Sequence, residues 1–166
     1  FVAEEYLGRA LDKGALAGSL AGCPTPGRFD VLRNDPLVLI DACHNPQSCE
    51  NFVSSLDEID PDASRRPVLL TAALADKDVS GIVDVLVPAF PQIVVTQTAS
   101  DRAISAAELA QLVEAKLEEL GRPVSNLVSV IPSVSDAVES LMNAQQAFVA
   151  AGTITLAGEV AGIMRG

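Results

Sequence analysis

The chain has 166 residues, and its composition and charge exclude several classes of protein. Hydrophobic residues make up 49% of it, which suffices for the core of about one domain and excludes intrinsic disorder. Acidic residues outnumber lysine and arginine by 22 to 11, and this net charge of −11 argues against nucleic acid or an anionic membrane surface as the main partner. Three cysteines without metal-ligand spacing predict reduced thiols in a cytoplasmic protein.

The first 27 residues differ from the rest of the chain. Residues 1–22 are helical in pattern and then rich in small residues, and the following CPTPG carries two prolines and a glycine. The chain also begins without methionine, so we expect it to be a piece of a longer polypeptide. The sequence predicts a remnant helix over 1–22, a linker over 23–27 and one domain over 28–166.

From residue 28 onward, short apolar runs predict six strands, at 29–32, 37–42, 68–74, 93–98, 127–131 and 147–152. The sequence RNDP between the first two is a turn signal and predicts an antiparallel hairpin. The other runs are continuous rather than alternating, which is typical of strands buried on both faces of a parallel sheet.

Helical patterns separate these runs. Amphipathic segments lie at 46–59, 79–87, 109–120, 136–144 and 154–166. Asn45-Pro46 fits an N-cap and first turn, Ser105 with Glu108 fits a capping box, and Ser133 or Ser135 begins the fourth helix. The alternation predicts a Rossmann-like, doubly wound α/β domain with a mostly parallel sheet of about six strands, one antiparallel at the edge, and flanking helices.

In such a sheet, ligands bind at the carboxyl ends of the strands. Polar side chains follow four of the predicted strands: Asp41 and His44, then Asp76, Lys77 and Asp78, then Thr98, Ser100 and Arg102, and finally Thr153. His44, the only histidine, can donate to a carboxylate or phosphate and can be charged near neutral pH. Asp41 can accept hydrogen bonds from ribose hydroxyls.

Structural roles are the alternative for each of these residues. Asp41 could cap the helix at 46–59, His44 could be a loop histidine, and Lys77 could be a solvated charge. Arg28, directly after the linker, could reach a nucleotide across a hinge or be one more surface arginine. The chain contains neither a phosphate-binding Gly-x-x-x-x-Gly-Lys-Ser/Thr run nor a Gly-x-Gly-x-x-Gly after the first strand.

The segments PGRFDVL, PLVLIDACHNPQS, ALADKD, DRAISAAEL and GTITLAGEV, in this order, resemble the carboxyl-terminal domain of folylpolyglutamate synthase/dihydrofolate synthase in the Mur ligase superfamily. The resemblance covers about residues 24–166. It implies an ATP-dependent ligase that joins L-glutamate to folate through an acyl phosphate. It also implies that the phosphate-binding loop and the Mg²⁺ ligands lie in an amino-terminal ATPase domain, so that residues 1–22 come from that domain and this chain alone is inactive.

The resemblance assigns roles to individual residues. Arg28 matches a linker arginine that reaches ATP, and Asp41 an aspartate against the nucleotide and hinge. His44 matches a histidine near the reacting centre and glutamate, and Thr153 a hydroxyl associated with amino-acid binding. Lys77 and Arg102 are further candidates, and no metal ligand is expected in this piece, which we expect to be monomeric.

Two residues depart from the family pattern, because Ala42 and Cys43 stand where glycine and alanine are usual. If the family needs a backbone angle at position 42 that only glycine adopts easily, Ala42 puts that angle in question. Two other hypotheses stay open. The chain could belong to another Mur-type ligase, of cell-wall precursors or cyanophycin, or it could be a non-catalytic α/β binding module.

Overall fold

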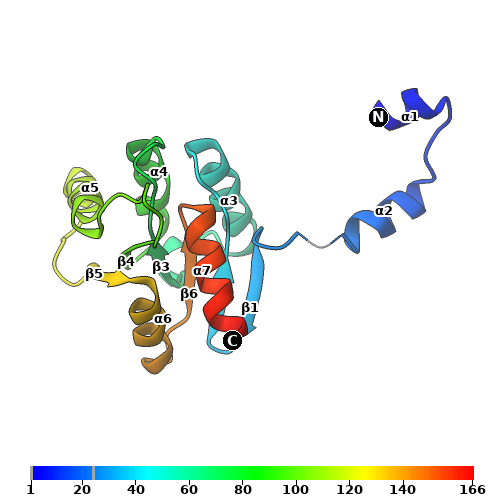
Figure 1. The fold of residues 1–166 in the computed structure, drawn as a ribbon. Coiled ribbons are helices and arrows are strands. Elements are labelled where there is room, and N and C mark those ends of the chain that lie inside the picture. Colours follow the sequence, from blue (N-terminus) through cyan, green and yellow to red (C-terminus); the bar gives the residue numbers. More distant parts are fainter. Residues whose placement is uncertain (1, 24) are drawn as a thin grey trace.

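The computed structural model describes residues 2–23 and 25–166, and a single six-stranded sheet organises the main body (Figure 1). Its strands are β1 (Asp30–Asn34), β2 (Leu37–Ile40), β3 (Val68–Thr71), β4 (Ile93–Gln97), β5 (Val128–Ser133) and β6 (Phe148–Ala151). They lie in the order β1-β2-β6-β3-β4-β5. Only β1 and β2 pair antiparallel, and every other neighbouring pair is parallel. The predicted fold class and the hairpin at one edge are confirmed.

Helices cover both faces of the sheet. They are α3 (Pro46–Ile59), α4 (Val79–Leu86), α5 (Ala106–Glu119), α6 (Val134–Asn143) and α7 (Ile154–Arg165), with short 3₁₀ turns at Ala63–Arg65 and Val87–Ala89. One apolar core joins the sheet to α3, α4 and α5, where Phe52, Ile82 and Leu109 are buried. A second core lies under α6 and α7, around Val138 and Leu156.

The helix starts follow the predicted capping chemistry. Asn45 and Ser105 each form a full capping box, the first with Ser48 and the second with Glu108. Ser133, rather than Ser135, caps α6, because its hydroxyl accepts a hydrogen bond from the backbone N–H of Asp136. These caps fix where the chain leaves each strand end and turns into the next helix.

Two expectations were wrong in detail. Strand β5 is not buried on both faces, since it forms the outer edge of the sheet and Val130 is 45% exposed. Within the predicted helix at 1–22, the described residues 2–22 form two helices rather than one: α1 (Val2–Leu7) and α2 (Lys13–Ala21). Gly8 has a φ of +61°, and Asp12 accepts a hydrogen bond from Ala15 N as a new N-cap, which together divide the segment.

Helices α1 and α2 lie apart from the sheet in Figure 1, and neither has a buried residue. Within the described parts of the chain, no helix has the length and apolar character needed to span a bilayer. That these helices belong to a preceding domain stays a prediction.

Candidate functional site

The strand ends bring the predicted site residues to one edge of the sheet. Strand β6 lies between β2 and β3, so Thr153, after β6, has the loops of both neighbouring strands beside it. Asp41 and His44 follow β2 on one side, and Lys77 follows β3 on the other. Chain order alone could not place Thr153 between them, because β6 is the last strand in sequence but an inner one in space.

Asp41 is buried and holds the chain that precedes β1 against the end of β2. Its Oδ2 accepts a hydrogen bond from Phe29 N at 2.9 Å, and its Oδ1 accepts one from Cys43 N at 2.8 Å. The guanidinium of Arg28 lies 3.7 Å from Oδ1. Asp41 therefore does not cap α3; it joins the linker to the site.

Two unusual backbone conformations hold this junction together. Gly27 has a φ of +74°, and its carbonyl accepts a hydrogen bond from Ala42 N at 2.7 Å. Phe29 also has a positive φ, of 45°, which is rare for a bulky residue, and its ring packs against Phe52 with centroids 5.8 Å apart. The ring contact and the bond to Asp41 stabilise a conformation that an isolated chain would avoid.

This junction presents Arg28 to the surface. The arginine side chain is 49% exposed, and together with Asp41, Ser48, Asn51 and Phe52 it borders a cavity of about 260 Å³. A half-exposed guanidinium can bind an anion such as a phosphate without losing a buried partner. The position of Arg28 is compatible with a contact to ATP, and that contact stays a prediction.

His44 has one ring nitrogen committed and one available. Its Nδ1 lies 3.1 Å from the carbonyl oxygen of Ala42, and because a carbonyl can only accept, Nδ1 carries the hydrogen. The backbone N–H of His44 donates to Ser48 Oγ, which belongs to the cap of α3. The ring is thus oriented by the helix start, and among the described residues Nε2 has no hydrogen-bond partner, so it can accept a hydrogen bond.

The two departures from the family pattern are accommodated. Ala42 does not have a positive φ, so no glycine-specific backbone angle is needed there. Cys43 points into the core and is fully buried, as is Cys49. A hydrogen bond to Cys49 and burial raise the pKa of the Cys43 thiol far above its usual range.

These thiols give a direct test of the site's packing. We expect a thiol reagent to modify Cys23 rapidly in the native chain, because Cys23 is exposed. Cys43 and Cys49 should react only after unfolding, since burial and a raised pKa keep Cys43 protonated at neutral pH. Mass spectrometry of the alkylated peptides measures this. Modification of Cys43 in the native chain at the rate of Cys23 would contradict the described packing.

Lys77 and Arg102 converge on a single carboxylate. Arg102 Nη1 lies 3.1 Å from Asp76 Oδ2, and Lys77 Nζ lies 3.6 Å from the same oxygen. The loop that carries Arg102 is tied to the end of β3, because Ala75 N donates to the Arg102 carbonyl at 2.7 Å. Lys77 and Arg102 therefore share one exposed anion, Asp76.

Thr153 is 1% exposed and caps α7. Its Oγ1 accepts a hydrogen bond from Thr155 N at 3.4 Å, which leaves its own hydroxyl hydrogen free to donate. The residue before it, Gly152, has a φ of +121°, which brings the chain close to the end of β3. A hydroxyl at a helix N-terminus is suited to a carboxylate or phosphate oxygen.

A family model described as Mur ligase, glutamate ligase domain, matches residues 27–158. The chain belongs to this family. The match begins at the linker glycine and includes every candidate site residue described above.

The similar proteins with curated names are folate enzymes. A dihydrofolate synthase/folylpolyglutamate synthase of Mycobacterium tuberculosis is 39% identical over 103 residues, which are 61% of this chain and 20% of that protein. A probable bifunctional folylpolyglutamate synthase/dihydropteroate synthase of Halobacterium salinarum is 32% identical over 128 residues, 77% of this chain and 14% of that protein. This Mur ligase domain thus matches about a fifth or less of the length of these two relatives.

A solved structure agrees. Folylpolyglutamate synthase of Mycobacterium tuberculosis, complexed with ADP and AMPPCP, superposes with a TM-score of 0.82 at 28% identity. The superposition covers 97% of this chain and 37% of that one. The fold of this Mur ligase domain is therefore that of about a third of a larger ATP-binding enzyme.

Proposed function

We propose that this chain is the glutamate-side domain of a folylpolyglutamate synthase, which joins L-glutamate to folate and uses ATP. The observation that carries the proposal is the gathering of Arg28, Asp41, His44 and Thr153 at one sheet edge in a Mur ligase glutamate ligase domain. The named relatives favour folate over a cell-wall precursor or cyanophycin as the acceptor. Family membership argues against a non-catalytic binding module.

The residues suggest a division of labour in an amide-forming reaction through an acyl phosphate. Arg28, half exposed, suits the phosphates of ATP. Thr153, at the N-terminus of α7, suits a carboxylate of the incoming glutamate, with Lys77 as additional positive charge. His44 offers Nε2 to the amine that attacks or to the phosphate that leaves. Asp41 positions Arg28 and the loop before His44.

Mg²⁺ bound with ATP would supply positive charge that stabilises the phosphates during the reaction. Over residues 2–23 and 25–166, no group of three or more histidine, cysteine, aspartate or glutamate side chains could hold a metal ion. The half-exposed Arg28 and the N-terminus of α7 support a role toward the phosphates of the nucleotide. We infer that Mg²⁺ and the phosphate-binding loop are supplied by an amino-terminal ATPase domain, to which α1 and α2 belong and toward which the linker 23–27 hinges.

The test is a domain exchange. Residues 25–166 would replace the matching domain of the Mycobacterium tuberculosis synthase, and glutamate-dependent ADP release would be measured with a folate substrate. We expect the chimera to turn over and the separate 166-residue chain to be inactive. We expect His44→Ala in the chimera to lower turnover by about a hundredfold, as is typical when a positioned polar group is removed from a closed site.

The control is Ser140→Ala, which changes an exposed hydroxyl on α6, across the sheet from α3 and outside the cavity that Arg28 and Asp41 border. This variant should keep full turnover and the same melting temperature. A folded but inactive chimera, or a His44→Ala chimera with unchanged turnover, would contradict the proposal. We also expect the complete enzyme to be cytoplasmic and monomeric. Size-exclusion chromatography with light scattering measures its oligomeric state.

A further inference from the structure

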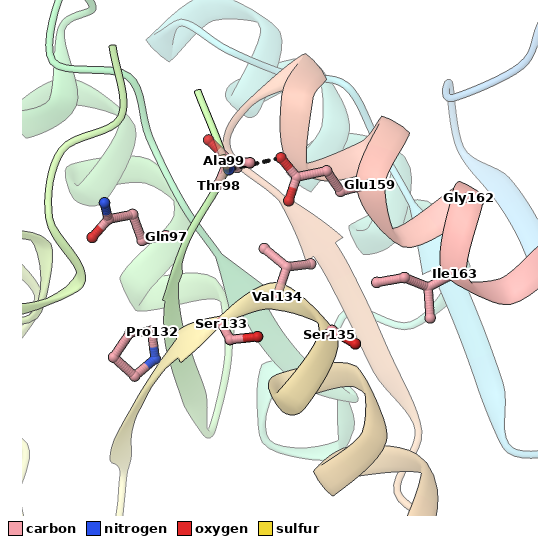
Figure 2. Close-up of a pocket in the computed structure, with 10 residues that line it drawn as sticks. All are labelled: Gln97, Thr98, Ala99, Pro132, Ser133, Val134, Ser135, Glu159, Gly162 and Ile163. Atoms are coloured by element: carbon pink, nitrogen blue, oxygen red, sulfur yellow. Dashed lines mark hydrogen bonds between the residues drawn. The ribbon is translucent and has the colours of Figure 1, made fainter. Parts of the chain in front are cut away.

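A second groove lies away from the site described above, at the carboxyl ends of β4 and β5. It has a volume of about 760 Å³, and Figure 2 shows its lining from the end of β4, the start of α6 and one side of α7. Pockets for small molecules typically span about 300–1,000 Å³. None of Arg28, Asp41, His44 or Thr153 lines it. We call this cavity the β4–β5 groove.

The topology places this groove where ligands are expected. The chain leaves β4 toward α5 on one face of the sheet and leaves β5 toward α6 on the other. Neighbouring parallel strands whose connections diverge in this way open a crevice beyond their carboxyl ends, and such switch points are the usual binding sites of open α/β sheets. The β4–β5 groove is such a crevice, and α7 closes its third side.

The groove contains an unused buried hydroxyl. Thr98 lines it and is 3% exposed, and Thr98 Oγ1 has no hydrogen-bond partner within the residues that the structure describes. A buried hydroxyl without a partner costs about 1–3 kcal/mol. A water molecule or a polar ligand in the groove would supply the missing partner.

The groove has a negatively charged carboxylate on one side and the partial positive charge of a helix N-terminus on the other. Glu159, on α7, uses Oε1 to accept a hydrogen bond from Ala99 N at 2.9 Å, and within the described residues Oε2 accepts none (Figure 2). Across the groove is the N-terminus of α6, a ten-residue helix, with the Ser133 and Ser135 hydroxyls. The carboxylate suits an ammonium group, and the helix start suits a carboxylate.

The rest of the lining is apolar and includes Val134 and Ile163. A free anion would be repelled by Glu159 and by the overall charge of −11, and a free cation would pair with Glu159 but leave the backbone N–H groups at the start of α6 unused. A molecule with an ammonium group, a carboxylate and an apolar portion can pair with Glu159, with the start of α6 and with the apolar lining. We propose that the β4–β5 groove binds a zwitterionic α-amino acid with an apolar side chain, through Glu159 and the N-terminus of α6.

Titration of the 166-residue chain with L-leucine and L-phenylalanine, followed by calorimetry and backbone amide NMR shifts, tests this. Binding of at least one of them should move the amides of Ala99, Ser135 and Ile163. For leucine, 3-methylbutylamine lacks only the carboxylate and 4-methylpentanoate lacks only the ammonium group. We expect each to bind at least about tenfold more weakly than leucine, because each loses one charge-assisted contact.

Two variants separate the groove from the rest of the domain. Glu159→Gln keeps an acceptor for Ala99 N but removes the charge, and it should weaken binding about tenfold. Gly162→Leu should abolish binding, because Gly162 lines the groove and an added Cβ meets no atom within 4 Å, so the larger side chain fills the groove without a backbone clash. Gly158→Leu is the matched control. Gly158 has equally open space one turn earlier and lines a different cavity, so this variant should bind normally.

Several outcomes would overturn the proposal. One is no binding of either amino acid up to about 10 mM, the range of very weak complexes. Another is equal binding of the amine or the acid alone. A third is a shift pattern centred on His44 and Thr153, which would place the amino acid at the first site. Because every measurement is binding to this chain, the result does not depend on the proposed ligase activity.

Discussion

We expect Gly152→Ala to lower the free energy of unfolding by at least about 3 kcal/mol, because an alanine at this position is both strained and crowded. The φ of Gly152 is +121°, a conformation that side-chain-bearing residues rarely adopt. A Cβ there would also lie 2.6 Å from the carbonyl oxygen of Ala72 and 2.7 Å from Thr71 Oγ1. Both obstacles belong to the end of β3, so the clash can be relieved only by moving β6 from its neighbour. Thermal melts should show a fall of at least about 6 °C for a domain of this size.

Gly121→Ala is the matched control for this variant. Gly121 has a φ of +66°, but an added Cβ meets no atom within 4 Å, so the substitution costs only backbone strain, about 1–2 kcal/mol. The difference between the two variants measures the close approach of β6 and β3. Equal losses of stability in both variants would show that β6 and the end of β3 can move apart at Gly152. Thr153 would then not be held tightly between the strand ends.

The order of elements along the chain was predictable because each depends on local pattern. Continuous apolar runs indicated the strands, and the N-cap pattern of Asn45-Pro46 and the capping box of Ser105 with Glu108 marked helix starts within a residue. The exposed face of β5 was not predictable, since local pattern does not tell which strand ends up at an edge. The break at Gly8 and Asp12 was visible in the sequence, but the helical pattern on either side outweighed it.

The candidate site shows the same division. Asp41, His44 and Thr153 could be named as candidates because they follow strands, and strand ends of a parallel sheet share one edge. The bond between Phe29 N and Asp41 joins residues 12 positions apart in separate elements, and no periodicity encodes it. The β4–β5 groove was missed for the same reason. Its contact between Ala99 and Glu159 spans 60 residues, and no local pattern around either residue indicates it.

We expect Asp41→Ala to lower the free energy of unfolding by about 2–5 kcal/mol, because it leaves the backbone N–H groups of Phe29 and Cys43 without their acceptor. The substitution should also loosen residues 27–30 locally, in addition to lowering the stability of the whole domain. Residues 27–30 are held on the end of β2 by Asp41 and by the bond from Ala42 N to the Gly27 carbonyl. Urea unfolding measures the stability, and amide hydrogen exchange should show faster exchange at Phe29 in this variant than in the unchanged chain.

Arg28→Ala separates the structural part of this junction from its proposed role with ATP. The Arg28 side chain is half exposed and 3.7 Å from Asp41, so its removal should cost at most about 0.5 kcal/mol of stability. Asp41→Asn should fall between the two, because the amide keeps one acceptor oxygen for Cys43 N but not a second for Phe29 N. In the chimeric enzyme, Arg28→Ala should raise the KM for ATP while the melting temperature stays unchanged. If Asp41→Ala were no less stable than Arg28→Ala, the carboxylate would not be what holds the linker, and Asp41 would be left with a ligand-facing role alone.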